Sequence, residues 1–171
     1  MNVHEAIRTR KSVRAYKEKP IEKESLERIL DSVRLAPSAR NEQEWRFIVV
    51  QEKSLKKKLA EAANNQSFLA EAGAVVVCCG ESTGRLMRCG QDPLPIDVAI
   101  AIDHLTLAAV EEGLGSCWVG SFYPDKVREI CGIPKEIVIV ELLALGYPKG
   151  PSGIAKKRLP IDEIIFYERW R

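Results

Sequence analysis

The chain lacks any apolar run long enough to cross a membrane as a helix. Its longest stretch without a polar or charged side chain, Ala72 to Gly80, covers only positions 72 to 80, whereas a bilayer requires roughly 20 apolar residues. The N-terminal residues 1–14 are rich in charge and contain no apolar segment of the kind that a secretory signal carries. We therefore expect a cytoplasmic protein without a membrane interaction.

Cysteine spacing gives no sign of a metal site or a disulfide framework. Of the five cysteines, Cys78 and Cys79 lie in the apolar stretch AVVVCCG and are interpreted as small buried hydrophobic residues. The other cysteines stand alone, without a CxxC pair or a Cys/His spacing typical of zinc. An odd number of cysteines also disfavours a complete set of disulfides.

An excess of one sign of charge is absent as well. The chain has 26 basic and 24 acidic side chains and a formal net charge of +2. Basic residues nevertheless gather near both ends, between Met1 and Lys19 and again at 156–158. This distribution favours a local anion site. The alternative, a nucleic-acid-binding module, is disfavoured by the near-neutral charge and by the lack of aromatic residues among the basic ones.

The sequence does contain the pattern of a globular domain of mixed secondary structure. Its 171 residues, 46% of them hydrophobic, suit one domain with its own core, so we expect a single domain over residues 1–171. Hydrophobic periodicity predicts helices at 1–9, 21–35, 53–63, 96–113 and 124–131, and strands at 45–51, 74–79, 116–119 and 137–145. Loops are predicted at 37–44 and 81–95, and an amphipathic tail at 161–171. Because helices and strands do not alternate strictly, this order favours an α+β fold over a doubly wound sheet. Neither a Rossmann nor a P-loop phosphate motif is present.

Four segments in a fixed order carry a family resemblance. They are RTRKSVRAY (8–16), LAPSARNEQEWRFIVV (35–50), LTLAAVEEGLGSCWVGSF (105–122), and ALGYPKG (144–150) followed by KKRLPIDEIIF (156–166). Together they resemble the nitroreductase family of FMN-dependent oxidoreductases over almost the whole chain. The resemblance implies a central, mainly antiparallel sheet flanked by helices, and a homodimer with FMN at the subunit interface. The apolar pattern of 96–113 and the apolar tail are consistent with such a dimer.

The resemblance also implies which residues hold the phosphate and ribityl chain of FMN. The residues that match the family pattern are Arg10, Lys11, Ser12 and Arg158. Arginine suits a phosphate because its guanidinium donates two parallel hydrogen bonds. Arg14 matches a position where a fixed cation stabilises negative charge on the reduced flavin and raises its reduction potential.

The remaining candidate contacts come from two loops and the strand at 116–119. In similar proteins the first loop reaches the flavin of the opposite subunit, and its residues here are Pro37, Ser38, Ala39 and Asn41. The residues expected beside the isoalloxazine ring are Trp118, Val119, Gly120 and Ser121. Gln66 is expected near the pyrimidine part of that ring. Gly120 suits a close backbone approach because glycine has no Cβ. The chain departs from the family at Glu44, which stands where a proline is usual, and in the short 81–95 region, where larger members shape the acceptor pocket.

The reaction implied by the resemblance is a ping-pong hydride transfer. NAD(P)H reduces FMN at N5 and leaves, and a small electron-poor acceptor, such as a nitroaromatic compound or a quinone, then takes the electrons. Because the flavin carries this chemistry, no side chain is assigned as catalytic, and Arg14 and Asn41 are expected to tune it. The short 81–95 region leaves open a non-catalytic alternative, an FMN-binding protein that stores flavin or senses redox state. No motif predicts the acceptor or the choice between NADH and NADPH.

Overall fold

The computed structural model describes residues 1–150 and 157–170 of the chain. Its strands are β1 (Trp45–Val50), β2 (Ala74–Glu81), β3 (Gly115–Val119) and β4 (Ile137–Gly146). Its helices are α1 (Val3–Thr9), α2 (Lys23–Arg34), α3 (Lys53–Ala62), α4 (Phe68–Glu71), α5 (Pro93–Glu111) and α6 (Pro124–Cys131), with short 3-10 turns η1 (Ala39–Asn41) and η2 (Ile161–Glu163). Every helix and strand predicted before the tail is present, and the α+β prediction is confirmed.

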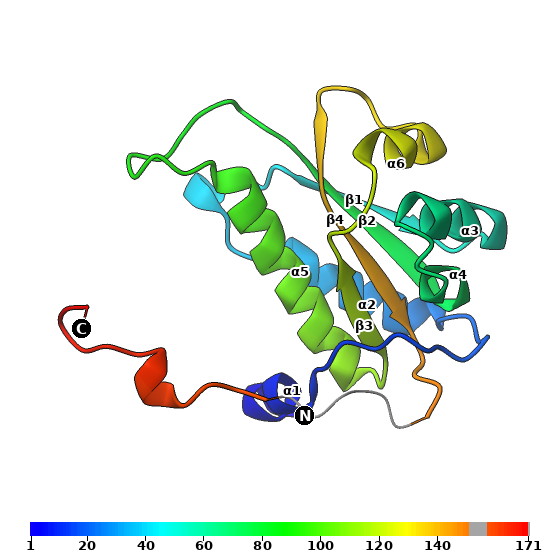
Figure 1. Cartoon of the computed structure of the whole chain (residues 1–171), viewed down its shortest axis with the longest axis horizontal. Helices are drawn as coiled ribbons and strands as arrows, with labels where there is room; N and C mark the ends of the chain where they lie inside the picture. Colours follow the sequence, from blue (N-terminus) through cyan, green and yellow to red (C-terminus); the bar gives the residue numbers. More distant parts are fainter. Residues whose placement is uncertain (151–156, 171) are drawn as a thin grey trace.

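One four-stranded sheet organises the fold, with the order β1-β2-β4-β3 (Figure 1). All neighbouring strands are antiparallel, which confirms the expected sheet type. The register between β2 and β4 shifts at Cys78/Cys79, where the ladder contains an irregularity. Since β2 and β4 fill the centre, β1 and β3 are the two edges of the sheet.

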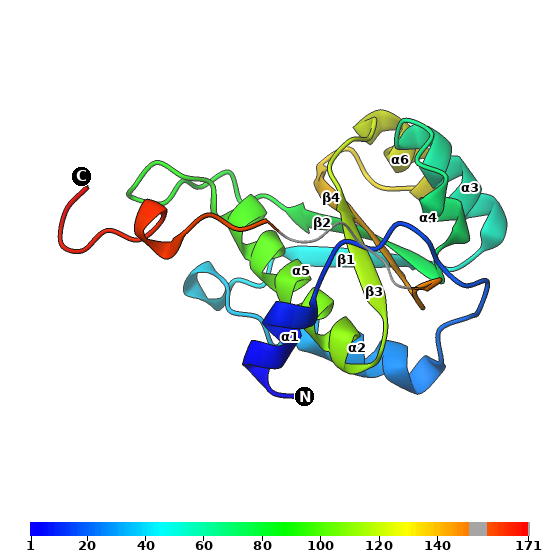
Figure 2. The same cartoon turned by 60° about the horizontal axis from the view of Figure 1, so that its bottom comes forward.

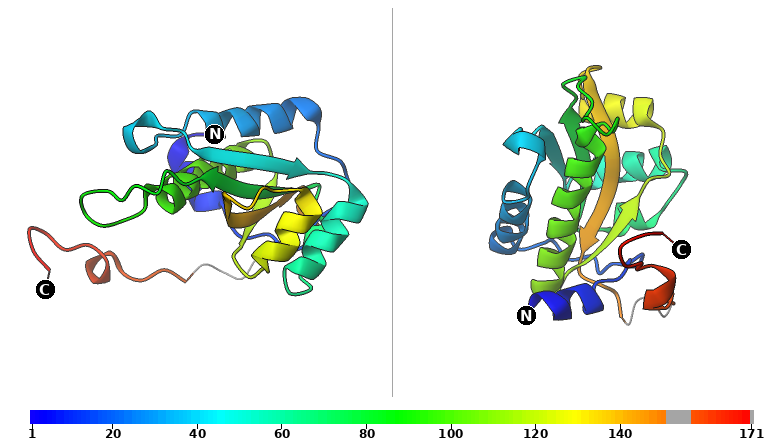
Figure 3. Two further views of the ribbon diagram at one scale, coloured as in Figure 1. Left: turned by 90° about the horizontal axis from the view of Figure 1, so that it is seen from above. Right: turned by 90° about the vertical axis from the view of Figure 1, so that its left-hand side faces the viewer.

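Helices α2 and α5 cover one face of the sheet, as the view from above shows (Figure 3). The period of α2 places Ile29 and Val33, four residues apart, on its buried side. Alternate residues of the central strands meet these helices, among them Val76 of β2 and Leu143 of β4. This layer forms one of the two hydrophobic cores.

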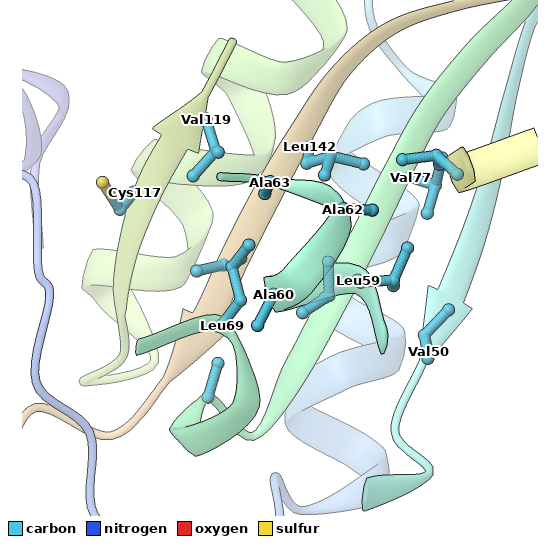
Figure 4. Close-up of a cluster of buried hydrophobic side chains, with 14 of the residues drawn as sticks. Val50, Leu59, Ala60, Ala62, Ala63, Leu69, Val77, Cys117, Val119 and Leu142 are labelled. Carbon is cyan, nitrogen blue, oxygen red and sulfur yellow. The ribbon is translucent and has the colours of Figure 1, made fainter. Parts of the chain in front are cut away.

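Helices α3, α4 and α6 cover the opposite face. Leu59 and Ala62 of α3 lie against Val77 of β2 and Leu142 of β4 (Figure 4). Of these helices, α4 was not predicted, because its four residues are too short to display a helical period. The second core packs α3 close to the end of β3 and so brings the connection after α3 to that edge.

The central helix α5 begins earlier than the sequence predicts. The carboxylate of Asp92 accepts a hydrogen bond from the backbone N–H of Leu94 at 3.0 Å, and Pro93 occupies the first turn, where it needs no partner. The helix therefore starts at Pro93, and the loop expected at 81–95 is shorter than predicted. Gly113, with φ 72°, follows the end of the helix, whereas Gly115 lies in β3 and takes no part in the cap.

Within the described residues, α5 alone has the length and composition that crossing a membrane would require, and 50% of its apolar window is buried in the fold. The sequence of this helix is not an uninterrupted apolar run, because Asp97, Asp103 and His104 lie among its apolar residues. Packing against α2 and the sheet accounts for its apolar composition.

The tail is mostly irregular. Among residues 157–170 only the short turn η2 forms, and Arg171 lies outside the described residues. The segment runs away from the body of the molecule and ends clear of it (Figures 1 and 2). Phe166 is half-buried, with its ring against that of Trp170. The other large hydrophobic side chains of the tail are exposed by 48% to 84%, and they are Leu159, Ile161, Ile164, Ile165, Tyr167 and Trp170.

Candidate functional site

Residues 10–16 extend the sheet beyond β3. Ser12 pairs with Ser116 of β3 in parallel, and the backbone N–H of Val13 donates to the carbonyl of Ser116 at 2.9 Å. The side chain of Val13 is buried, which fixes the orientation of its neighbours. The predicted site residues of this segment differ in exposure: Arg10 and Ser12 are half-buried, and Lys11 and Arg14 are exposed.

A glycine allows this close approach. A Cβ at Gly115 would lie 2.4 Å from Cγ2 of Val13 and 3.2 Å from Cγ of Pro148. Any other residue at the start of β3 would displace the segment. The glycine of the L-G-x-x-W motif therefore sets the spacing between β3 and the basic residues beside it.

Three predicted site residues gather around Cys117 of β3. Burial raises the pKa of the Cys117 thiol, while the positive charge of Arg14, a hydrogen bond from Ser12 and the charge of Arg10 act in the opposite direction. The segment that carries them runs along the β3 edge, because Ser12 and Val13 pair with Ser116, the residue before Cys117. Two guanidinium groups and a hydroxyl are a donor set suited to an anion.

The segment Trp118–Ser121 ends β3 and turns away from the sheet. Trp118 is half-buried and Val119 buried, while Gly120 and Ser121 are exposed. The side-chain amide of Gln66 donates to the backbone carbonyl of Ser121 at 3.4 Å, so the predicted Gln66 lies at this edge.

Asn64 joins the same group, although the sequence analysis did not select it. Its amide donates to Oγ of Ser121 at 2.7 Å. Asn64 and Asn65 both adopt left-handed backbone conformations, with φ 55° and 59°, which make a tight turn after α3. Two consecutive asparagines were the signal in the sequence, since this residue type tolerates such a turn.

A glutamate lies beneath Gly120, and sequence reasoning missed it too. Glu141 pairs with Cys78 across β2 and β4, and a Cβ at Gly120 would lie 3.5 Å from its Oε2 and 3.6 Å from its Oε1. Oε1 is buried and has no hydrogen-bond partner among the described residues. Burial raises the pKa of Glu141, partly opposed by the backbone N–H groups of Val119 and Leu142. The only signal in the sequence was a charge interrupting an apolar strand.

The loop between α2 and β1 is held in place by α5. The backbone N–H of Ala39 donates to the carboxylate of Asp97 at 2.8 Å, and Oγ of Ser38 accepts from the backbone of Gln43 at 3.0 Å. Left-handed backbone conformations occur at Arg40 (φ 54°), Asn41 (φ 59°) and Gln43 (φ 52°). Asparagine tolerates such a conformation, but it is unfavourable for Arg40 and Gln43 and is retained there where the surroundings enforce it.

A salt bridge connects this loop to the short loop that precedes α5. Arg85 donates to the carboxylate of Glu42 at 2.6 Å, and both side chains are about two-thirds buried (33% and 27% exposed). Glu44, at the family's proline position, is buried, and its Oε2 has no hydrogen-bond partner among the described residues. The two loops thus form one connected unit next to the start of α5.

The predicted site residues therefore fall into separate groups. Residues 10–14, Gln66 and Trp118–Ser121 meet at the β3 edge, whereas Pro37–Asn41 precede β1 at the opposite edge of the sheet (Figure 1). Arg158 lies in the exposed tail and makes no hydrogen bond or salt bridge within the described part of the chain. Lys156 lies outside the described residues.

The outer side of α5 carries an open depression of about 580 Å³. Its lining residues are Pro95, Ile96, Ala99, Ile100, Asp103 and His104. Ile96 is 43% exposed, and the depression lies on the surface that faces away from the sheet. An apolar hollow on a central helix is typical of a contact surface.

Comparison with known proteins gives consistent matches over most of the chain. The sequence profile of the nitroreductase family matches residues 7–94 and 63–147. An Archaeoglobus fulgidus protein provisionally named an NADH dehydrogenase/NAD(P)H nitroreductase is 39% identical over 166 residues, covering 95% of this chain and 87% of that protein. The FMN reductase (NAD(P)H) of Bacillus subtilis is 27% identical over 185 residues, covering 98% and 74%.

A solved structure has the same fold over nearly its full length. The crystal structure of a nitroreductase family protein from Clostridium difficile 630 superposes with a TM-score of 0.87 and 36% identity, covering 99% of this chain and 100% of that one. Identity at this level together with the fold supports common descent.

Proposed function

Because this chain belongs to the nitroreductase family, it is an NAD(P)H-dependent oxidoreductase, and we propose that it uses FMN to pass electrons from NAD(P)H to a small electron-poor acceptor. The family expected from the four sequence motifs is confirmed. The name of the Bacillus subtilis relative, an FMN reductase, supports the choice of flavin. The observation that carries the proposal is the β3 edge, where the basic segment 10–14 pairs with β3 and the amides of Asn64 and Gln66 donate to Ser121 beside the exposed Gly120.

The groups at this edge fit the chemistry of FMN. Arg10, Lys11 and Ser12 would hold the phosphate and ribityl hydroxyls with charge-assisted hydrogen bonds. The exposed backbone at Gly120 would lie against the ring system, with the amide of Gln66 close to its polar edge. When bound, FMN supplies a carrier that accepts a hydride from NAD(P)H and donates electrons to the acceptor, chemistry that no side chain here provides.

Arg14 is assigned to electrostatic tuning. It is exposed, and its positive charge partly opposes the rise that burial causes in the pKa of Cys117 on β3. A cation fixed there would stabilise negative charge on the pyrimidine ring and raise the reduction potential. Arg158 remains the proposed second phosphate contact.

The active form is proposed to be a homodimer with FMN at the subunit interface. Within one chain the proposed FMN contacts are far apart in the sheet order, because Asn41 and its loop lie at the β1 edge and Gly120 lies at the β3 edge. A two-fold axis would bring the loop of one copy to the β3 edge of the other. The hollow on α5 and the exposed hydrophobic tail offer the surfaces for that contact, since a monomer would leave both in water.

We further propose that residues 1–171 work as one domain in the cytoplasm. The two hydrophobic cores share one sheet, and every described element before the tail packs on it or on a helix that does. The acceptor is proposed to be small, because the connection between β2 and α5 is short and is pinned by Arg85 to Glu42.

Flavin absorbance of the purified protein tests this function. We expect about one FMN per chain, bleaching on anaerobic addition of NADH or NADPH, and recovery of colour when a quinone or nitroaromatic compound is added. FMN that binds but is bleached by neither nicotinamide would favour the non-catalytic alternative, a flavin store or redox sensor. A chain that binds no FMN on reconstitution would refute the cofactor.

A matched pair of variants locates the cofactor. Arg10→Ala is expected to weaken FMN binding by about tenfold to a hundredfold, because a hydrogen bond to a charged group contributes about 1.5–3 kcal/mol. Lys135→Ala removes an exposed cation between α6 and β4 and serves as the control. Equal affinities for the two variants would exclude Arg10 from the phosphate site.

A further inference from the structure

The sheet contains one carboxyl group that its surroundings do not neutralise. Glu141 lies on the face of β4 that carries Leu143, and its partner across β2, Cys78, is buried in the same core. The carboxyl group reaches the edge at Gly120, which is exposed and has no side chain to cover it. One side of this group is therefore enclosed by apolar side chains, and the other lies beneath the exposed backbone of Gly120, where we place the ring of FMN.

The environment of Glu141 favours its uncharged form. Oε1 is buried without a hydrogen-bond partner among the described residues, and an unpaired charge there would lose its hydration. No basic side chain is among the groups that act on the pKa of Glu141, and burial is the largest of them and raises it. A buried acid without a cation retains its proton to a higher pH than an exposed one.

We propose that Glu141 is the proton donor of the site and delivers its proton to the acceptor that is reduced beside Gly120. This inference rests on the proposed function and assigns a step that the cofactor does not complete alone. A hydride adds one proton and two electrons, whereas a quinone needs two protons and two electrons. The second proton must come from water or from a group at the site, and Glu141 is placed to supply it.

The balance for a quinone is simple. Quinone, NAD(P)H and H⁺ give hydroquinone and NAD(P)⁺, so NAD(P)H is oxidised by two electrons and the quinone is reduced by two. The O–H bond of Glu141 breaks and an O–H bond forms on one quinone oxygen. The carboxylate then takes a proton from solvent, which restores the starting state. A neutral acid adjacent to the acceptor is the form that general acid catalysis requires.

Other titratable groups near Glu141 are distinguishable from it. The strands beside it carry Cys78, Cys79 and Glu81 on β2 and Cys117 on β3, and α5 on the same face carries Asp97 and Glu111. Asp103 and His104 of α5 line the depression on its outer side. The charge of Glu141 acts on the Cys78 and Cys117 thiols. Burial raises the pKa of the Cys78 and Cys117 thiols above their ordinary range, so the thiols remain protonated where a carboxyl group titrates. The assignment to Glu141 therefore requires the variant, not the pH profile alone.

The test compares two acceptors in the holoenzyme. In Glu141→Gln, a neutral side chain of the same shape replaces the acid, and we expect reduction of a quinone to slow by about a hundredfold, within the range of general acid catalysis. Ferricyanide takes one electron and no proton, so its reduction should be unchanged, as should bleaching by NAD(P)H. In the wild type, the quinone rate should fall as pH rises through the pKa of Glu141, and the ferricyanide rate should not. Glu136→Gln, an exposed position just before β4, is the control.

A second measurement does not depend on activity. With ¹³C at the glutamate carboxyl carbons, one resonance of the protein should titrate above the others and be absent from Glu141→Gln. A quinone rate unaffected by Glu141→Gln, an equal loss with ferricyanide, or the absence of a high-titrating resonance would each overturn the inference. FMN that NAD(P)H fails to bleach in the wild type would instead overturn the proposed function, and the inference with it.

Discussion

The buried carboxylate of Asp97 accepts a hydrogen bond from the backbone N–H of Ala39 across 2.8 Å, although 58 positions separate the two residues. Asp97 is only 5% exposed, so water does not compete freely for this bond. The bond attaches the loop Pro37–Asn41 to the start of α5, the same helix that carries the apolar hollow. In the proposed dimer, this contact sets the position from which the loop reaches the partner's flavin.

Asp97→Ala should therefore affect both stability and cofactor binding. The half-buried N–H of Ala39 loses its acceptor, which costs about 1–3 kcal/mol, and the left-handed residues of the loop lose their anchor. We expect a lower free energy of unfolding in urea at fixed protein concentration, and weaker FMN binding. Asp97→Asn keeps an acceptor oxygen, so its free energy of unfolding and its FMN affinity should lie between those of the wild type and Asp97→Ala. If Asp97→Ala retained the stability and FMN affinity of the wild type, other contacts would hold the loop Pro37–Asn41.

Gly115→Ala tests the spacing between β3 and the basic segment. Its methyl group would lie 2.4 Å from Cγ2 of Val13, a distance that forces Val13 and its neighbours to move. Overpacking of this kind costs about 1–3 kcal/mol and displaces Arg10 and Ser12 from their positions. We expect a lower midpoint of thermal unfolding and weaker FMN binding in a fluorescence titration.

Two further variants make the Gly115 result specific. Adding Val13→Ala to Gly115→Ala removes the nearest methyl group and should recover part of the FMN affinity. Gly120→Ala, whose Cβ would meet no atom of Glu141 closer than 3.5 Å, is the control for stability. Equal destabilisation by Gly115→Ala and Gly120→Ala would argue against a steric origin.

The sequence predicted the local elements because their signals are local. Ile29 and Val33 repeat at the helical interval, and the apolar run at 74–79 is buried on both faces of β2. The predicted ends of helices and strands were less accurate where a capping side chain sets the end, as Asp92 does at the start of α5. The motifs also selected residues 10–14, Gln66 and Trp118–Ser121, which the fold brings to one edge; their role in binding stays a prediction.

The residues that the sequence did not reveal depend on long-range pairing. Glu141 lies beneath Gly120 only because β4, the last of the four described strands, inserts between β2 and β3. No local pattern encodes that order. The contact of Asp97 with Ala39 is of the same kind, since an aspartate within an apolar helix gives no indication of its partner.

Stability should fall in acid through the pair of Arg28 and Glu112, which joins α2 to the end of α5. Nε and Nη2 of Arg28 donate to the two carboxylate oxygens, each at 2.7 Å, and lower the pKa of Glu112 from 4.5 to about 2. A carboxyl group with a lowered pKa stabilises the folded state above the unfolded value, and the contribution disappears as pH falls from 4.5 toward 2. Since the side chain of Arg28 is 59% exposed, solvent screens the pair and we expect its contribution to stability to be small.

Urea unfolding of Glu112→Gln and the wild type over this pH range measures the effect. The difference in the free energy of unfolding between the wild type and Glu112→Gln should be largest near neutral pH and vanish in acid. Glu27→Gln, which removes only an exposed partner of Lys23 at 3.7 Å, is the control and should show little difference at any pH. A difference for Glu112→Gln that persists unchanged in acid would assign the effect to packing and not to the ion pair.

Removal of the tail should weaken the proposed dimer. The side chains beyond Arg158 include Ile161, exposed by 77%, and Trp170, which is exposed by 84% although its ring lies against that of Phe166 in the tail itself. Burying a large hydrophobic side chain contributes about 1.5–3 kcal/mol, so a chain that stops at Arg158 should have a dimer dissociation constant raised by at least about a hundredfold, or about 2.7 kcal/mol. Sedimentation equilibrium over a range of concentrations measures this constant, and Asp162→Asn in the full chain controls for changes in tail charge. A truncated chain that dimerises as tightly as the full one would exclude the tail from the interface and leave the hollow on α5 as the contact to be tested next.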